Sequence, residues 1–317
     1  DFYTTSPVCS PARASILTGR MPSQHGIHDW LCGGNTVAKY EPEGGEPFIE
    51  YLQGQPGYTD YLAANGYTCG ISGKWHMGDS HHPQKSFSYW NVHAKGGGPY
   101  YNAPMVRDGE LYEEPNYVTD VITDNALDFL NAQKETEQPF CLNVHYTAPH
   151  SPWSRANHPH PVYDEYHQHC AFASVPATQR HPWQGNVLFP QSAEDRRGIL
   201  SGYYAAVTEM DRNVGRILDW LEDNDLRDNT CVLFLSDNGM NMGHHGIYGK
   251  GNGTFPLNMY DTSVKVPALM SWPECVAGGQ REEMLLSQYD LLPTILDIAG
   301  VRDVDLDGLP GRSFKGV

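Results

Sequence analysis

Apolar side chains along this chain follow two spacings that alternate, one typical of helices and the other of buried strands. The clearest helix is predicted over residues 199–221, where apolar residues recur every third or fourth position. The clearest strand covers residues 230–235, a continuous apolar run of the kind enclosed on both faces in parallel sheets. Further helices are predicted over residues 58–65, 117–133 and 289–299, and further strands over residues 67–73, 139–146 and 264–272. This alternation predicts an α/β fold with a mostly parallel central sheet and helices on both faces.

Three stretches lack such a pattern and are expected to be loops. Residues 31–57 are rich in Gly, Pro and Glu, whereas residues 80–116 and 154–191 carry many aromatic side chains. Loops of this length are usually functional or mobile, and their aromatic residues either border a binding cleft or serve as packing. Two H-x-H pairs, at residues 158–160 and 167–169, lack a third ligand at fixed spacing, so we expect no zinc site there.

Composition and charge narrow the classes of partner. The chain has 317 residues, 39% of them hydrophobic, which suits one large α/β domain or two smaller ones. A formal charge of -17 argues against nucleic acid and anionic membranes as partners, and an anionic substrate would need a local basic pocket. No apolar run approaches the roughly 18 residues of a membrane span. The seven cysteines are scattered, without a C-x-x-C pair.

One acidic segment near the end imitates an ion-binding loop. Residues 303–308 match the first half of an EF-hand loop. Phe314 stands at the twelfth position, where a bidentate Glu is required, and no flanking helix pair is evident. A turn is therefore predicted there.

The first candidate chemistry lies close to the start of the chain. Pro11 suits the first turn of a helix and Gly19 suits its end, which places Cys9 just before a short helix. Free backbone N–H groups and the helix dipole favour an anion at that point and lower the pKa of a thiol. Arg13, about one turn on, can point back to the same spot. These residues favour a nucleophile, or its precursor, facing an anionic substrate; the alternative is a small buried cysteine and a surface arginine.

Two further pairs of polar residues lie at the ends of predicted strands. Lys74 and His76 are two apart in an extended segment, so they share a face and set a cation beside a titratable base. Asp237 and Asn238 follow the strand 230–235 and offer the hard oxygen ligands that Ca²⁺ or Mg²⁺ prefers. The alternatives are a solvated lysine with a capping histidine, and an ordinary Asx turn.

Two loops contribute the remaining candidates. His150 and Trp153 follow the predicted strand 139–146, at the carboxyl end where α/β sheets bind ligands. His245 and Lys250 lie in the loop after the Asp-Asn pair. All candidates therefore fall at strand ends or in the loops after them, on one side of the predicted sheet.

Several separated motifs carry a resemblance to a known family. Residues 9–13 (CSPAR) resemble the C-x-P-x-R signature of type I sulfatases, members of the alkaline phosphatase superfamily, with Ala12 where Ser is commoner. Residues 73–76 (GKWH) look like the family's G-K-x-H element, and residues 149–152 (PHSP) like its P-H-x-P element. Residues 237–239 (DNG) look like its metal-binding element, followed by the matching Lys250. Their order along the chain makes the resemblance far more specific than the first motif alone.

The resemblance implies a nucleophile and a metal. Cys9 would be oxidised to formylglycine, and one hydroxyl of the hydrated aldehyde would attack the sulfur of a sulfate ester. Ca²⁺, rather than Mg²⁺, would be bound by Asp237 and Asn238 and would polarise a sulfate oxygen. Arg13 and Lys74 would hold and charge-stabilise the nucleophile.

The resemblance also implies how the products leave. His150 and Lys250 would contact the sulfate and the leaving oxygen, one of them assisting departure of the alcohol. His76 would take a proton from the second hydroxyl, so that sulfate is eliminated and the aldehyde returns. His245 and Trp153 are expected to contact the substrate.

Substrate class, partners and location are expectations from the same resemblance. The substrate is expected to be a sulfated carbohydrate, as a small molecule or a polysaccharide, and a formylglycine-generating enzyme is expected to modify Cys9. A periplasmic or secreted location is expected, although no signal peptide is visible. The alternatives are a phosphonate or phosphate ester hydrolase of the same superfamily and a non-catalytic binding protein that keeps the fold.

Two features of the family have no match. Family members carry an Asp-Asp pair of metal ligands at the end of a strand upstream of the signature, and nothing before Cys9 corresponds to it. Their smaller carboxyl-terminal subdomain also has no counterpart after residues 311–313. Residues 1–317 are therefore expected to be the catalytic α/β domain without its first strand and its C-terminal subdomain.

Overall fold

The computed structural model describes residues 1–31, 49–185 and 189–316. Most of the loop expected over residues 31–57 therefore lies outside the described residues. The α-helices are α1 (Cys9–Thr18), α2 (Pro22–His25), α3 (Tyr58–Ala64), α4 (Val118–Gln133), α5 (His160–His169), α6 (Ala193–Asp223), α7 (Asp261–Val264) and α8 (Leu291–Ile298). Short 3₁₀ helices are η2 (Arg155–Asn157), η3 (His244–Gly246), η4 (Gly251–Gly253) and η5 (Gln288–Asp290).

The strands are short and separated by long connections. They are β1 (Phe2–Tyr3), β2 (Thr68–Lys74), β3 (Tyr89–His93), β4 (Ala103–Arg107), β5 (Glu110–Glu114), β6 (Phe140–His145), β7 (Val232–Leu235), β8 (Asn241–Met242), β9 (Tyr248–Gly249), β10 (Lys265–Val266), β11 (Ala268–Ser271) and β12 (Leu286–Ser287). Every helix and strand predicted from the apolar pattern is present, with ends shifted by a few residues.

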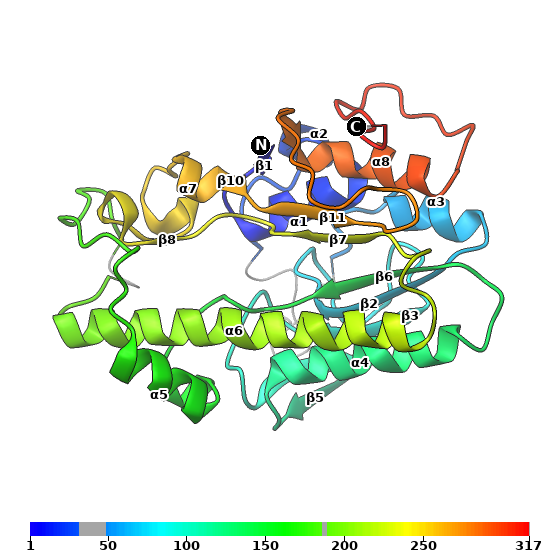
Figure 1. The fold of residues 1–317 in the computed structure, drawn as a ribbon. Coiled ribbons are helices and arrows are strands. Elements are labelled where there is room, and N and C mark those ends of the chain that lie inside the picture. The colour runs from blue at the N-terminus through cyan, green and yellow to red at the C-terminus, as the bar shows by residue number, and fades with distance from the viewer. Residues whose placement is uncertain (32–48, 186–188, 317) are drawn as a thin grey trace, which may run out of the picture.

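The central sheet has the strand order β5-β4-β3-β2-β6. β2 is parallel to both β3 and β6, whereas β4 and β5 extend the sheet in antiparallel fashion. Figure 1 shows α4 and α6 on one side of this sheet and α1, α3 and α8 on the other. The predicted α/β architecture with helices on both faces is therefore confirmed, and its sheet is mixed, with the parallel strands at its centre.

Packing on both faces holds the strand that leads into the site. On one face, Leu17 of α1 and Leu62 of α3 join Ile71 of β2 in a buried apolar cluster. On the other face, a side chain at Gly70 would come within 2.7 Å of the ring of Phe129 in α4. Only a glycine allows this approach of helix to strand.

The remaining strands form smaller groups. β1 lies between β10 and β12, and β7 pairs with β11 in antiparallel fashion. The run at 230–235 is expected to be enclosed on both faces, but every residue of β7 is only half-buried. That expectation is wrong because β7 belongs to a two-stranded ladder rather than to the interior of a parallel sheet.

The two aromatic stretches contain regular structure that their sequence does not reveal. β3, β4 and β5 occupy part of residues 80–116, where only loop was expected. β4 contains a proline and β5 is mostly exposed, so neither has a clear alternation of apolar and polar residues. α5 lies within residues 154–191, and Tyr163 is its one buried residue, so it carries no apolar stripe.

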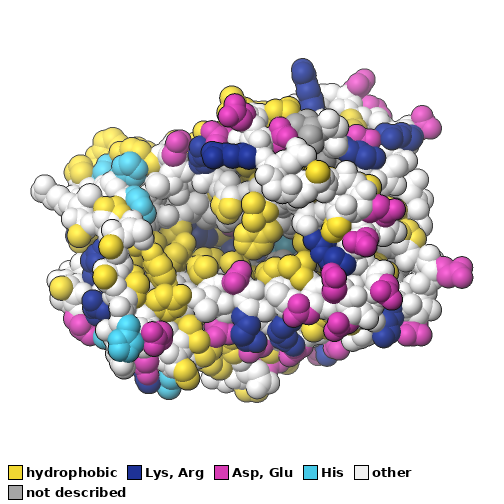
Figure 2. Space-filling view, viewed as in Figure 1, with side chains coloured by type: hydrophobic (Ala, Val, Ile, Leu, Met, Phe, Trp, Pro, Cys, Tyr) yellow, Lys and Arg dark blue, Asp and Glu magenta, His cyan; other side chains and the backbone are white. Residues whose placement is uncertain are grey.

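Two further features concern the surface of the molecule and the end of the chain. Figure 2 shows a hollow above α6 in the face viewed in Figure 1, with hydrophobic side chains gathered along it. The segment 303–308 forms a bend and a turn, as predicted. Within the described ranges, no helix combines the length and apolarity that crossing a membrane requires.

Candidate active site

Cys9 lies at the N-terminus of α1, as the sequence predicts. Val8 precedes the helix in an extended conformation, Pro11 occupies the first turn, and Gly19 ends the helix with a φ of 65°. The side chain of Cys9 is almost fully enclosed, with 5% of the residue exposed. Lys250 Nζ lies 2.7 Å from Cys9 Sγ and donates a hydrogen bond to it.

The surroundings of Cys9 favour a negative charge at that position. Burial raises the pKa of the Cys9 thiol, whereas the positive charges of Lys250 and Lys74 lower it. The lysines prevail, and the pKa of Cys9 is lower than that of a free cysteine. The same contact, together with Asp237, outweighs burial and raises the pKa of Lys250, which is therefore charged.

Asp237 is the anion that balances the buried cations. Its Oδ2 lies 3.3 Å from Arg13 Nη1 and 3.9 Å from Lys74 Nζ. Burial alone would raise the pKa of Asp237, but Lys74, Lys250 and Arg13 together hold it far below its usual range. The carboxylate is therefore ionised at neutral pH and available as a ligand.

The guanidinium of Arg13 is fixed by groups at the ends of β2 and β6. Arg13 Nε donates to the carbonyl oxygen of Trp75 at 2.9 Å, and Nη2 donates to the carbonyl oxygen of Lys74. Nη2 also lies 2.6 Å from His145 Nδ1. Burial and the charge of Arg13 lower the pKa of His145 to about 3, so its ring is neutral and Nδ1 accepts this hydrogen bond.

Sequence reasoning missed His145 as a residue of the site. A signal was present, because this histidine ends an otherwise apolar predicted strand on the edge that carries the other candidates. Nothing in the local pattern indicated that it would face Arg13, which is 132 residues away in the chain.

Asn238 presents an oxygen without a protein partner. Its Nδ2 donates to the carbonyl oxygen of Gly239 at 2.9 Å, whereas its buried Oδ1 has no hydrogen-bond partner among the described residues. Gly239 is required at this turn, because a side chain there would come within 2.2 Å of the carbonyl oxygen of Thr262. An ionised Asp237 beside an unpaired amide oxygen fits a hard divalent cation.

The described residues supply only part of a complete ligand set for such a cation. They contain no group of three or more His, Cys, Asp or Glu side chains arranged to hold a metal. The main-chain carbonyl of Asp237 is fixed by Gln288, whose Nε2 donates to it at 2.7 Å. The backbone that carries the Asp237 side chain is therefore held in place.

His76 is buried and neutral beside the lysines. Its Nε2 lies 3.0 Å from the carbonyl oxygen of Leu31 and donates to it, which leaves Nδ1 as a buried acceptor without a partner among the described residues. Burial, followed by the charge of Lys74, lowers the pKa of His76 well below its usual value. A side chain at Gly96 would come within 2.1 Å of the His76 ring, so this glycine is needed for the ring to fit.

His150, in the loop after β6, is also neutral. Its Nδ1 lies 2.8 Å from the carbonyl oxygen of Ser151 and donates to it, so Nε2 carries the free lone pair. Burial, followed by the charges of Lys250 and Lys74, lowers the pKa of His150 well below its usual value. Gly97 packs against this ring, where a side chain would come within 2.9 Å.

The structure places the two remaining candidates outside this charged cluster. Trp153 is 4% exposed and donates from Nε1 to the carbonyl oxygen of Pro149 at 2.9 Å. His245 is exposed, and its ring stacks on Tyr260 with centroids 4.0 Å apart. Trp153 is three residues after His150 in the same loop, whereas His245 lies in η3, five residues before Lys250.

The chain matches the model of a known protein family. The family model described as Sulfatase matches residues 1–301. The chain belongs to the sulfatase family. The predicted family and the alkaline-phosphatase-like α/β fold are thereby confirmed.

Two curated relatives are themselves sulfatases. An N-acetylglucosamine-6-O-sulfatase of Bacteroides thetaiotaomicron is 27% identical, over 100% of this chain and 63% of that protein. An N-acetylgalactosamine-6-sulfatase of Sus scrofa is 32% identical, over 98% of this chain and 57% of that protein. The sulfatase chain described here thus spans about three fifths of the length of these relatives.

A solved structure has a similar fold. The crystal structure of Ps i-CgsB in complex with k-i-k-neocarrahexaose is similar over 100% of this chain and 66% of that one. Its TM-score is 0.74 and its sequence is 25% identical. The bound oligosaccharide belongs to that protein.

Proposed function

We propose that this chain is the catalytic part of a hydrolase of sulfate esters, acting on a sulfated carbohydrate. The observation that carries the proposal is the contact between Cys9 Sγ and Lys250 Nζ at 2.7 Å, inside a cluster that also holds Arg13, Lys74 and Asp237. Buried cations around a nucleophile position provide the local basic pocket that an anionic ester needs on a chain of charge -17. The names of both curated relatives, which are 6-sulfatases of N-acetylhexosamines, support the carbohydrate class.

The proposed nucleophile is Cys9 after oxidation to formylglycine by a maturation enzyme. The hydrated aldehyde supplies one hydroxyl for attack and a second that allows sulfate to leave. Lys74 stabilises negative charge as it develops beside position 9, since its charge already lowers the pKa of the Cys9 thiol. Arg13, one turn further along α1, is proposed to act with it. A plain serine at this position would retain a stable sulfate ester.

The proposed cofactor is Ca²⁺, held by the Asp237 carboxylate and by Asn238 Oδ1. These donors fit because the carboxylate is ionised and the amide oxygen lacks a protein partner among the described residues. When bound, the metal polarises a sulfate oxygen. Arg13 meanwhile orients Asp237 through its ion pair.

His150 and Lys250 are the groups proposed to act at the leaving oxygen. His150 Nε2 carries a free lone pair and Lys250 is charged, so the ammonium is the proton donor and the imidazole an accepting or orienting group. His76 Nδ1, buried and without a partner among the described residues, is the proposed base for the second hydroxyl. His245 and Trp153 are proposed to meet the part of the substrate that extends out of the cluster.

We further propose that the protein acts in the periplasm or outside the cell, in line with its relatives.

The decisive test of the proposed activity compares sulfate release from 6-sulfated N-acetylglucosamine, 6-sulfated N-acetylgalactosamine and an aryl sulfate with phosphate release from an aryl phosphate. Sulfate esters should be preferred, and mass spectrometry should show an aldehyde in the peptide containing Cys9. A preference for phosphate would overturn the assignment, and a persistently unmodified thiol with no turnover would favour a binding protein.

A further inference from the structure

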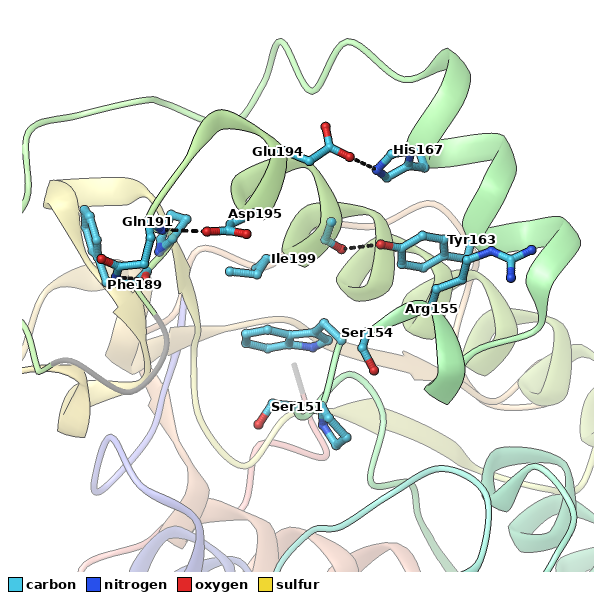
Figure 3. Close-up of a pocket in the computed structure, with 14 residues that line it drawn as sticks. Ser151, Ser154, Arg155, Tyr163, His167, Phe189, Gln191, Glu194, Asp195 and Ile199 are labelled. Atoms are coloured by element: carbon cyan, nitrogen blue, oxygen red, sulfur yellow. Dashed lines mark hydrogen bonds and ion pairs between the residues drawn. The ribbon is translucent and has the colours of Figure 1, made fainter.

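A cavity of about 640 Å³ opens next to the loop that carries His150, and Trp153 is the one lining residue to which the proposed function gives a role. It is bounded by the loop after β6, by α5 and by the first turns of α6, as Figure 3 shows. Trp153 and Tyr163 line it together with Phe189, and Ser151 lies at one edge. This volume lies in the range of small-molecule sites and could hold one or two sugar rings.

The cavity lies close in the structure to the segments that carry His150 and Lys250, the two groups proposed to act at the leaving oxygen. Ser151, at its edge, directly follows His150 and accepts the hydrogen bond from that ring. On the other side, the ring of Phe189 packs edge-on against Tyr248, with centroids 5.6 Å apart, and Tyr248 lies two residues before Lys250. The cavity therefore lies next to the segments that carry both groups proposed to act at the leaving oxygen.

The charged side chains of the wall give the cavity a negative character. Glu194 and Asp195 both line it, and the Glu194 side chain is 76% exposed. Arg155 also lines the cavity, but a bidentate salt bridge with Asp164 neutralises its charge, and both N–O distances in this salt bridge are 2.6 Å. His167 lies 3.1 Å from Glu194, and Figure 3 shows the two side chains directed toward each other. A second sulfate or carboxylate would be repelled here, whereas neutral hydroxyls would find acceptors.

We propose that this cavity is a subsite for an uncharged sugar residue linked to the sulfated one. The inference rests on the proposed function, because it takes the reacting sulfate to lie at Cys9. Aromatic and apolar walls would contact the ring faces, and the carboxylates would accept hydrogen bonds from hydroxyl groups. The cavity thus selects for the substitution of the neighbouring sugar, independently of which sugar carries the sulfate.

The first test fills the cavity. Gln191→Trp places a large ring at its rim, and Gln191→Ala is the matched control that removes the same side chain without filling the space. The substrates are N-acetylglucosamine 6-sulfate and the disaccharide in which it is linked to an unsulfated sugar. Gln191→Trp should reduce kcat/KM for the disaccharide by about tenfold or more and leave the monosaccharide within about twofold. Equal losses on both substrates would overturn the proposal.

The second test reverses the charge of the wall. Wild-type protein should hydrolyse the disaccharide with an unsulfated neighbour faster than the same disaccharide sulfated on both sugars. Glu194→Lys should reduce that preference by roughly fivefold, the upper end for a pair of charges near a surface. Glu222→Lys makes the same charge change at the other end of α6 and should leave the preference unchanged. An unchanged preference in Glu194→Lys would contradict the charge argument.

A binding measurement separates this inference from the proposed function. In the Cys9→Ala background, which cannot turn over, calorimetry with the same disaccharide should show binding that Gln191→Trp weakens about tenfold and Gln191→Ala does not. If wild-type protein cleaves no sulfate ester and this binding difference persists, the function fails and the subsite stands. If the protein cleaves sulfate esters but the cavity-filling variant binds the disaccharide normally, the subsite is refuted.

Discussion

Lys250 Nζ and Cys9 Sγ lie 2.7 Å apart although the two residues are separated by 241 positions in the chain. The contact joins the N-terminus of α1 to the loop between β9 and η4. It also makes the two pKa values interdependent, because the ammonium lowers that of the thiol and the thiolate raises that of the ammonium.

Lys250→Met should raise the pKa of the unmodified Cys9 thiol, since it removes the nearest positive charge and leaves burial in place. The measurement is a pH titration of thiolate absorbance, taken as the difference from the Cys9→Ala variant. Lys134→Met, a lysine outside the site, should leave the titration unchanged. In matured protein, Lys250→Met should lower kcat by about 10² or more; a titration identical to that of wild type would show that the lysine does not govern position 9.

Asp237→Asn should destabilise the fold and remove its response to Ca²⁺. The substitution leaves the buried Arg13 and Lys74 without their anion, a change that costs about 3 kcal/mol for buried pairs. Urea unfolding with and without Ca²⁺ measures both effects, because a cation at 100 times its Kd adds about 2.7 kcal/mol to the wild type. Asp307→Asn, in an exposed turn, is the control. A Ca²⁺ response that survives in Asp237→Asn would place the metal elsewhere.

Gly96→Ala should reduce activity through the position of His76. The added methyl group would come within 2.1 Å of the ring, so the ring must move. A displacement of about 1 Å at a catalytic group can cost about 10² in rate. Gly278→Ala, where nothing lies within 4 Å, should be neutral in the same assay. Full activity in Gly96→Ala would exclude His76 as the base.

The buried, neutral His25 should lower the free energy of unfolding in mild acid. Burial lowers the pKa of His25 from 6.5 to about 4, so the folded protein keeps the ring neutral while the unfolded chain takes up a proton. The stabilisation is therefore complete above pH 6.5 and is lost as the pH falls from 6.5 to about 4. The difference between the unfolding free energies at pH 7.5 and pH 5 should be roughly 2 kcal/mol smaller in His25→Asn than in wild type.

A specific hydrogen bond would also be lost if the buried ring took up a proton. His25 Nδ1 accepts from the backbone N–H of Ile27 at 3.1 Å, and Nε2 lies 3.2 Å from Ser15 Oγ. A proton on Nδ1 would break the first bond inside the core. An unaltered pH dependence in the variant would contradict this assignment.

Local patterns were sufficient to predict the helices and strands that carry the site. Cys9 was found because Pro11 and Gly19 mark the two ends of its helix, and Lys74 and Asp237 because each follows a predicted strand. The family motifs then related these separate ends to one another. Packing of α1 against β2 brings Arg13 to the end of the strand at Lys74.

Other parts depend on contacts that no local pattern encodes. β4 and β5 escaped prediction because a proline and exposed charged residues hide their alternation. His145 became part of the site only through Arg13, and the cavity is assembled from the loop after β6, α5 and the start of α6. Such features depend on how distant segments meet, which periodicity does not specify.

The enclosure of Cys9 sets an order of events during biosynthesis. The residue is 5% exposed once the chain has folded, and the lysine that contacts its thiol is translated 241 residues later. An oxidising enzyme would therefore find the cysteine accessible on the nascent chain and shielded afterwards. Folding ahead of maturation would leave a well-formed protein with an unmodified thiol at its centre, so the order of folding and maturation would decide how many molecules become active.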